Sequence, residues 1–272
     1  MLRNMRHGYV LMLCRNYVFE AITDEQRLCR VLCFPRPERG CCSQRLEVLR
    51  ELGIEYLYSF GNLLIERGLR VVGKGHSAIV VLAKHNIVGV VGLKVRRIDS
   101  TRDSLESEAR MLMLAENTDL VPKIFAFTRD FIVREYIDGS TLKHLIASAA
   151  EILLKKIFVK LIEAAFELDR IGIDIAEVSR PDAQVVFMCN DPEKPYFIDL
   201  GSARLSPWPT NVTRIISSLV RDCIGSQVFC KKWGEGRVRN LILLSRQYKK
   251  SLAEEVRRCI LMQIINEIYD MN

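Results

Sequence analysis

The stretch "LRVVGKGHSAIVVLAKHNIVGVVGLKVRR" (residues 69–97) decides the fold class, because it is rich in β-branched residues and punctuated by glycine. Its apolar runs are interrupted at "GKGHSA" (73–78) and again at "KHN" (84–86), where turn-forming residues gather. Strands joined by such short connections pair with one another in antiparallel fashion. We therefore expect consecutive antiparallel strands that begin a sheet.

The segments that follow predict one helix inserted in the sheet and a helical second half. Residues 103–117 carry apolar side chains at helical spacing, and residues 122–137 are typical of two further strands. Residues 141–170 form an amphipathic stretch of one or two helices, and the chain from Asn211 onward is mostly helical, with Asn211 as the cap of its first helix. The pattern predicts an α+β fold, in which an antiparallel sheet with one helix precedes a short, mainly helical part carrying a strand pair.

The first 68 residues are basic, and their patterns are mainly helical. In "SQRLEVLRELGI" (43–54), Ser43 is a candidate N-cap and Gly53 a candidate helix stop. A small helical module is expected here, with a winged helix as one candidate arrangement. The predicted domains are therefore an N-terminal module at 1–68, a sheet domain at 69–138 and a helical domain at 139–272.

Composition favours a folded globular protein without a membrane partner. The chain has 272 residues, of which 49% are hydrophobic and 27% charged, and its apolar runs are far shorter than the ~20 residues that cross a bilayer. The formal net charge of +7 favours polyanionic partners, which include nucleic acids, acidic proteins and nucleotides.

The cysteines predict a reducing compartment, and we expect a cytoplasmic protein. There are nine, an odd number, in a chain long enough to fold without disulfides. The cluster of Cys29, Cys33, Cys41 and Cys42 does not have the C-x2-C spacing of a zinc site.

The turn at "GKGHSA" is a candidate phosphate-binding loop. Gly73 and Gly75 flank Lys74, and glycines let backbone N–H groups approach phosphate oxygens without a Cβ in the way. Ala78 stands where a third glycine would complete a G-x-G-x-x-G pattern. An ordinary hairpin turn is the alternative.

A lysine and a glutamate are candidates for a buried ion pair. Lys94 lies in the middle of an apolar strand, and an ammonium there needs an anionic partner. Glu108 lies on the apolar face of the following helix and is preferred to Glu106 as that partner, although nucleotide phosphates could also serve. Arg96 shares a strand face with Lys94, which favours a solvent-facing strand instead.

Two carboxylates follow in the second half of the chain. Glu177 lies in a loop before the strand "QVVF" (184–187), and Asp199 ends the strand "YFID" (196–199) and is followed by Gly201. Such a pair can divide the work of phosphoryl transfer, one positioning the nucleophile and the other holding magnesium. A simple strand-end turn at Asp199 is the alternative.

Taken in order along the chain, these stretches resemble the protein-kinase superfamily in a reduced form. The resemblance is to the archaeal predicted serine/threonine protein kinases, which are related to the Rio-type kinases and the small kinases of transfer-RNA-modification complexes. It covers about residues 69–215. The matching segments are "VVGKGHSAIVVLA", "GLKVRR", "SLESEARMLMLAEN", "VPKIFAF", "IVREYIDGSTL", "LDRIGIDIAEVSRP" and "YFIDLGSARLSPWPTNVT".

The resemblance implies a bilobal kinase-like fold that binds ATP and magnesium. It makes the turn at Gly73, Lys74 and Gly75 the loop that covers the phosphates, Lys94 the α/β-phosphate ligand and Glu108 its helix partner. It also makes Glu135, Tyr136 and Ile137 the hinge that meets adenine through backbone groups. Asp199 becomes the metal-binding aspartate, with Leu200 in place of the usual phenylalanine.

The chain departs from the kinase pattern in its catalytic loop. Ile175 stands in place of the usual histidine and Glu177 in place of the catalytic aspartate. Counting five residues onward gives Asp182 as the second metal ligand, whereas counting back from the strand gives Gln184. No Ala-Pro-Glu motif follows Asp199, which indicates a short helical lobe without the usual peptide-docking platform.

Three functions follow from these observations. The first is an ATP- and magnesium-dependent serine/threonine kinase that could also phosphorylate itself, with a protein substrate that the sequence does not identify. The second is a nucleotide-binding pseudokinase or scaffold. The third is a nucleic-acid- or ribosome-associated protein, in which residues 1–68 bind the partner and a kinase-like domain acts as a switch.

Overall fold

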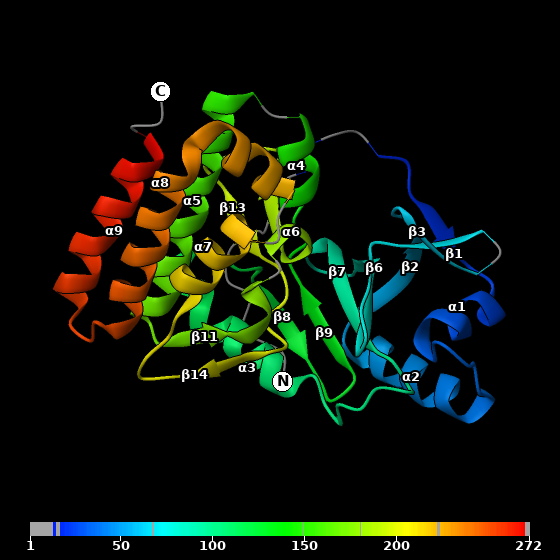
Figure 1. Cartoon of the computed structure of the whole chain (residues 1–272). Coiled ribbons are helices and arrows are strands. Elements are labelled where there is room, and N and C mark those ends of the chain that lie inside the picture. Colours follow the sequence, from blue (N-terminus) through cyan, green and yellow to red (C-terminus); the bar gives the residue numbers. More distant parts are fainter. Residues whose placement is uncertain are drawn as a thin grey trace. The chain divides into compact units, whose positions relative to one another are not determined.

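The computed structural model describes residues 13–14, 17–66, 68–148, 150–179, 181–221 and 224–269. The chain divides into two compact units, and each is described by itself (Figure 1). The first comprises Met1–Met113 and Pro122–Ile137, and the second comprises Leu114–Val121 and Asp138–Asn272. The boundary after Ile137 lies next to the one predicted at residue 138.

The first unit is built on an antiparallel sheet, as the sequence pattern predicted, and this sheet has seven strands. The strand order is β1-β2-β6-β7-β9-β8, and β5 also pairs with β6. The helix α3 (Glu106–Ala115) follows β7 in the chain, and a hairpin of β3 (Leu63–Glu66) and β4 (Leu69–Val71) forms a separate sheet. The seven strands are β1 (Glu20–Ile22), β2 (Ile54–Ser59), β5 (Gly73–Lys74), β6 (Ala78–His85), β7 (Gly89–Arg96), β8 (Ile124–Phe127) and β9 (Phe131–Arg134).

Strand alternation determines which side chains enter the core. On β7, Val91, Leu93 and Val95 are buried in the hydrophobic core, so that Gly92 and Lys94 lie on the opposite face of the strand. The helices α1 (Glu25–Leu32) and α2 (Arg39–Glu51) contribute to that same core. The sheet therefore has one face covered by apolar residues of these helices and another that carries Lys94.

The N-terminal segment differs from the predicted helical module. Its described part also contains β1 and β2, which extend the main sheet beside β6. Apolar residues of the segment, among them Val31, Leu49 and Leu57, share one core with β6 and β7. Alternating apolar and aromatic residues in "IEYLYS" favour a strand, and the predicted boundary at residue 68 falls inside the first unit.

The predicted start of α2 is wrong, whereas its predicted end is confirmed. The helix begins at Arg39, and Cys42 N already donates to Glu38 O at 3.0 Å, so Ser43 lies inside the helix and not at its cap. Gly53 follows the end of the helix with φ +73°, a left-handed conformation that favours glycine.

The second unit is mainly helical. The helices α4 (Leu142–Ser148) and α5 (Glu151–Arg170) occupy the stretch predicted as one or two helices. The C-terminal helices α7 (Asn211–Arg221), α8 (Ile224–Lys250) and α9 (Glu254–Tyr269) pack against one another, and α7 and α9 contact α5 (Figure 1). None of the described helices combines the length and the apolar character needed to span a bilayer.

Two small sheets complete the second unit. One has three strands, β10 (Gly139–Thr141), β12 (Val185–Met188) and β13 (Pro195–Phe197), and the other pairs β11 (Ile173–Ile175) with β14 (Ala203–Leu205). The predicted strands at "QVVF" and "YFID" overlap β12 and β13, but β13 ends at Phe197, so Asp199 lies two residues beyond the strand and does not end it. Short helices lie between these elements, namely η1 (Glu116–Thr118), η2 (Ala176–Ser179) and α6 (Pro181–Gln184).

Candidate functional site

The predicted pair of Lys94 and Glu108 is confirmed within the first unit. Lys94 Nζ donates to both carboxylate oxygens of Glu108, at 2.6 and 2.8 Å. The two side chains are only 7% and 1% exposed. Glu106, the competing candidate, instead forms an exposed pair with Arg110 one turn along the same helix.

Burial of this pair needs an explanation other than stability. Removing two charges from water is costly, and the attraction between buried partners often only offsets that cost. Arg96, predicted on the same strand face, does not compete for Glu108, because its side chain donates to Asp130 and to Arg102 O. Glu108 thus holds the ammonium group of Lys94 at a fixed place on the sheet.

The glycine turn between β5 and β6 is held by backbone bonds. Gly75 N donates to Ala78 O at 2.8 Å, and Arg97 N donates to Ser77 O at 2.9 Å. A Cβ at Gly73 or Gly75 would meet its nearest atoms at 3.5 Å, an ordinary contact, and neither residue has a positive φ. The backbone conformation therefore does not require glycine, and the N–H of Gly75 is already bonded within the turn.

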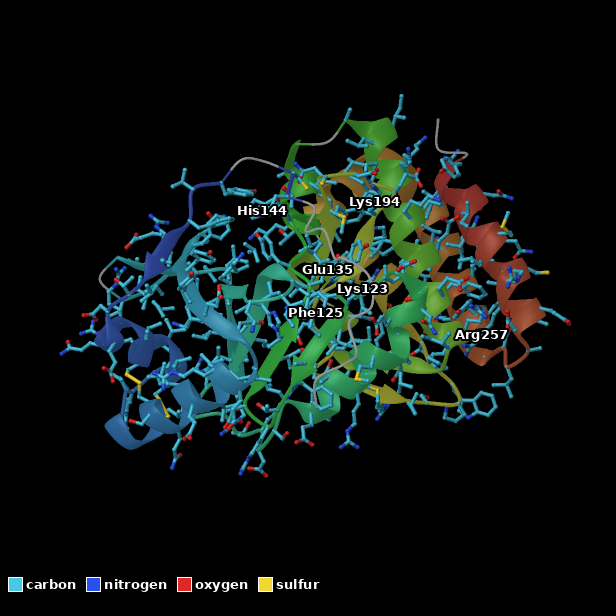
Figure 2. The ribbon with its side chains drawn as sticks, turned by 180° about the vertical axis from the view of Figure 1, so that it is seen from behind. Lys123, Phe125, Glu135, His144, Lys194 and Arg257 are labelled. Carbon is cyan, nitrogen blue, oxygen red and sulfur yellow. A yellow bond between two sulfur atoms is a disulfide. The ribbon has the colours of Figure 1, made fainter. Side chains whose placement is uncertain are left out.

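The predicted hinge follows β9 in the first unit. Glu135 N donates to Lys123 O at 2.8 Å, and Lys123 N donates to Glu135 Oε2 at 3.2 Å, which places the two residues beside each other (Figure 2). Tyr136 contacts the ring of Phe60 edge-on, with 6.4 Å between ring centroids, and Ile137 is buried. The hinge backbone is thus fixed at the end of the sheet.

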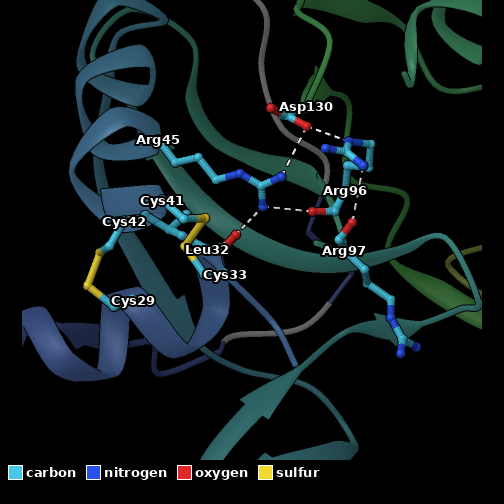
Figure 3. The surroundings of a disulfide bond; sticks show 9 residues. All are labelled: Cys29, Leu32, Cys33, Cys41, Cys42, Arg45, Arg96, Arg97 and Asp130. Atoms are coloured by element: carbon cyan, nitrogen blue, oxygen red, sulfur yellow. Dashed lines mark hydrogen bonds and ion pairs between the residues drawn. A yellow bond between two sulfur atoms is a disulfide. The ribbon is translucent and has the colours of Figure 1, made fainter. Parts of the chain in front are cut away.

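Two disulfides join α1 to α2, which differs from the free thiols expected. Cys29 pairs with Cys42 and Cys33 with Cys41, with Cα atoms 5.2 and 6.4 Å apart (Figure 3). The pairing follows from the packing of α1 against α2, because it brings Cys29 and Cys33 within disulfide range of Cys42 and Cys41. The cytoplasmic location stays a prediction.

In the second unit, the loop carboxylate Glu177 is placed beside the residues that follow β13. Gln184 Nε2 donates to Glu177 Oε2 at 3.2 Å, and Glu177 N donates to Ser202 Oγ at 3.1 Å. Ile198 N donates to Gln184 O at 3.0 Å, which fixes the residue before Asp199. The catalytic-loop candidates and the aspartate segment therefore meet in one unit.

Asp199 and Gln184 each carry an oxygen atom of the kind that binds hard cations. Asp199 is half-buried, and its Oδ1 accepts from Gly201 N at 3.0 Å. Gln184 Oε1 is buried and has no hydrogen-bond partner among the described residues. A buried amide oxygen without a partner is costly, and a cation would satisfy it.

These residues fit a magnesium ion better than a metal held by protein alone. Over the described ranges, no group of three or more His, Cys, Asp or Glu side chains is placed to hold a metal. Magnesium takes one or two carboxylates and completes its shell with phosphates and waters. Of the two candidates for the second ligand, Gln184 fits, whereas the side chain of Asp182 lies outside the described residues.

A buried asparagine holds the strand that leads to Glu177. Asn211 Oδ1 accepts from Ile175 N at 2.9 Å, and Asn211 Nδ2 donates to Ile173 O at 2.6 Å. Both bonds fix β11, which runs directly into η2 and Glu177. Asn211 begins α7 as predicted, but its side chain binds β11 and does not cap its own helix.

Asp169 provides the cap that was assigned to Asn211. Its carboxylate accepts from Asn211 N at 2.8 Å, from Val212 N at 3.3 Å and from the Tyr248 hydroxyl at 2.9 Å. Burial raises the pKa of Asp169 to about 6, although these hydrogen bonds favour its ionised form. Sequence spacing did not reveal this role, because Asp169 lies 42 residues before the helix it caps.

A second buried aspartate strengthens the same region. Asp174 on β11 accepts from Thr210 N at 3.0 Å and binds Arg214 and Arg204. Burial alone would raise its pKa, but the bonds from Arg214 and Thr210 and the charge of Arg204 lower it below the usual value. The strand before Glu177 is therefore anchored by two independent polar contacts to α7.

The second unit also has a pocket of about 490 Å³, between α5 and α9. Its lining includes Lys160, Phe166, Arg258 and Met262, and none of the predicted site residues. It therefore does not contribute to the candidate site.

The chain matches no model of a known protein family, and no curated protein matches it. Function is therefore inferred from the residues of the two units and from the sequence resemblance.

Proposed function

We propose that this protein is an ATP- and magnesium-dependent serine/threonine protein kinase of a reduced, atypical kind. The buried Lys94–Glu108 pair carries the proposal, with 2.6 Å between Nζ and Oε1. In protein kinases, a strand lysine that pairs with a glutamate of the following helix holds the α- and β-phosphates. Here the lysine is on β7 and the glutamate on α3, the next helix in the chain.

The proposed roles divide between the units. In the first, the turn at Gly73, Lys74 and Gly75 covers the phosphates, and the backbone of residues 135–137 binds adenine. In the second, Asp199 and Gln184 would hold magnesium. The bound ion would neutralise charge on the phosphate oxygens.

Glu177 is the proposed group that orients the substrate hydroxyl. Its side chain is exposed, and its Oε2 accepts from Gln184 Nε2 at 3.2 Å. The amide of Gln184 thus orients the carboxylate through its nitrogen, while its unpartnered oxygen remains available for the cation. The side chain of Gln184 would therefore set the positions of both the Glu177 carboxylate and the magnesium ion.

A phosphotransfer assay tests the proposal. The purified chain is incubated with ATP labelled at the γ-phosphate, alone and with a generic serine-rich protein, in magnesium and after chelation. We expect magnesium-dependent label on the protein or on the substrate, and its loss in Lys94→Met. ATP binding without any transfer would contradict the kinase assignment and favour the nucleotide-binding scaffold.

The nucleic-acid alternative is favoured by one observation in the first unit. Aromatic rings near β1 and β2 form a continuous series of contacts, with centroid separations of 5.0 Å for Tyr17–Phe60, 5.2 Å for Phe19–Phe60, 5.2 Å for Phe19–Tyr58 and 6.4 Å for Tyr56–Tyr58. Aromatic side chains on a basic protein are typical of surfaces that stack single-stranded bases.

Binding of a labelled single-stranded oligonucleotide at several salt concentrations tests this alternative. A steep fall in affinity with salt, together with weaker binding by Tyr56→Leu, would support it. Tyr56 suits the test because it is 47% exposed, so that its replacement disturbs the core little. Affinity that does not depend on salt or on Tyr56 would contradict it.

A further inference from the structure

The glycine turn is braced from outside the sheet by Phe34, the residue that follows Cys33. We propose that Phe34 is a positioning residue for this turn and that the Cys33–Cys41 disulfide holds it there, so that reduction of this disulfide weakens nucleotide binding. The inference rests on the proposed function, because it assumes that the turn at residues 73–78 contacts phosphates.

Two cations of the turn region contact the ring of Phe34. Lys74 Nζ and the guanidinium carbon of Arg97 each lie 5.1 Å from the ring centroid. Both distances are within the range of a cation–π attraction. Lys74 is part of the turn itself, so the ring restrains one of the residues expected near the phosphates.

Arg97 carries the restraint to the backbone of the turn. Its Nη1 donates to Gly75 O at 3.0 Å, and its backbone N donates to Ser77 O at 2.9 Å. Asp99 fixes the other edge of the guanidinium, with bonds of 2.8 and 2.7 Å. Arg97 therefore contacts both sides of the turn, Gly75 through the guanidinium that Phe34 and Asp99 hold, and Ser77 through its backbone.

The disulfide fixes the segment that carries Phe34. Cys33 is fully buried, and its bond to Cys41 closes a loop with a sequence separation of eight. On its other side, Phe34 O accepts from Ile98 N at 3.0 Å. Without the disulfide, this backbone bond, the cation contacts of the ring and the packing of Phe34 against the hydrophobic core would have to hold the loop.

The second disulfide supplies a matched control within the same hairpin. Cys29–Cys42 joins the same two helices but is not adjacent to Phe34. While it remains intact, loss of Cys33–Cys41 frees the loop at Phe34 and leaves α1 attached to α2. The two disulfides should therefore differ in their effect on the turn.

Reduction requires a dithiol as the electron donor. One thiolate of the dithiol attacks Cys41 Sγ, which is half-buried, breaks the bond to Cys33 Sγ and forms a mixed disulfide. Cys33 leaves as a thiolate and takes up a proton. The second thiol of the reductant then displaces Cys41 and becomes part of a cyclic disulfide, so that two electrons and two protons are transferred in all.

The first test is calorimetry of magnesium-ATP binding to the full chain. We expect Cys33→Ser/Cys41→Ser and Phe34→Leu each to bind about five- to thirtyfold more weakly, the range expected for losing two exposed cation–π contacts. The control Cys29→Ser/Cys42→Ser should bind within about twofold of the parent, since it leaves those contacts in place. Adding Phe34→Leu to the first double variant should cause no further loss. Equal effects of the two disulfide pairs, or no effect of Phe34→Leu, would overturn the proposal.

A measurement without nucleotide separates this inference from the proposed function. Amide hydrogen exchange over residues 69–81 should be faster in Cys33→Ser/Cys41→Ser and in Phe34→Leu than in the parent or the control pair. Faster exchange in a chain that binds no ATP would support the brace and contradict the proposed function. Unchanged exchange would overturn the brace, whatever the ATP affinity. If Cys33→Ser/Cys41→Ser does not fold, Phe34→Leu still tests the brace, and unchanged exchange in Cys29→Ser/Cys42→Ser after treatment with the dithiol would overturn the role of the disulfide.

Discussion

The Lys94–Glu108 pair serves either ligand binding or stability. Removing the charge of Lys94 alone, and then the charges of both residues together, distinguishes these two roles. In Lys94→Met, the carboxylate of Glu108 is left unpaired at 1% exposure. Breaking a buried pair in this way costs about 3–5 kcal/mol, a large part of the roughly 5–15 kcal/mol that stabilises a domain. In Lys94→Met/Glu108→Leu, both charges are gone, and we expect a free energy of unfolding equal to that of the parent or higher by about 1–4 kcal/mol.

Urea unfolding followed by circular dichroism gives the stabilities, and calorimetry gives the ATP affinity. Both variants should bind ATP at least about tenfold more weakly, because no neighbouring residue replaces the ammonium. The exposed pair Glu106–Arg110 on the same helix is the control, and its removal should change the free energy of unfolding by less than about 0.5 kcal/mol.

Two results would refute this reasoning. If the double variant is as unstable as Lys94→Met, the pair serves the fold. If the double variant keeps the ATP affinity of the parent, Lys94 is not a phosphate ligand, and the proposed function loses the observation that carries it.

Three further predictions concern the second unit. Asp199→Asn should fold normally but lose magnesium-dependent nucleotide binding, and calorimetry that still shows full magnesium dependence would make Asp199 only a turn residue. Glu177→Gln should lower the rate of phosphotransfer about 10²- to 10⁴-fold while sparing ATP affinity. Glu177→Asp should be only partly active, because its carboxylate retracts by ~1 Å. A rate for Glu177→Gln equal to that of the parent would show that Glu177 takes no part in the reaction. The pKa of Asp169 is raised from 3.8 to about 6, so its contribution to stability is present below the lower value and is lost as pH rises through the higher one. The free energy of unfolding of the parent, relative to that of Asp169→Asn, should therefore fall by about 2 kcal/mol between pH 4 and pH 7, and no change would contradict the raised pKa.

Local periodicity was sufficient to predict strands β6 to β9 of the first unit and the buried ion pair, but not β1 and β2. Alternation along "VVGLKVRR" separates Lys94 from its apolar neighbours, and helical spacing places Glu108 on the buried face of α3. Both signals lie within one element. The pairs β6–β7 and β8–β9 likewise follow from short connections, whereas the pairing of β7 with β9 spans the connection that contains α3 and did not follow from spacing.

Contacts between residues far apart in sequence could not be predicted. Asp169 caps a helix that begins 42 residues later, so the nearer Asn211 was assigned its role. The amide oxygen of Gln184 has no partner among the described residues, and sequence spacing does not reveal this. The disulfides depend on how α1 lies against α2, and the cysteine spacing alone did not indicate the two pairings.

The contacts of Arg45 on α2 determine when the N-terminal helices can complete their packing during synthesis of the chain. Its guanidinium binds Leu32 O and Arg96 O, and pairs with Asp130 at 3.0 Å across 85 residues of sequence (Figure 3). During synthesis, the N-terminal helices therefore leave the ribosome well before the carboxylate that neutralises this nearly buried cation. Closing so long a loop is slow, and the hairpin is without its anchor until the turn between β8 and β9 has emerged. The N-terminal helices should thus complete their packing only when most of the first unit has been synthesised, and a fragment that ends before residue 130 should not acquire the structure they have in the full chain.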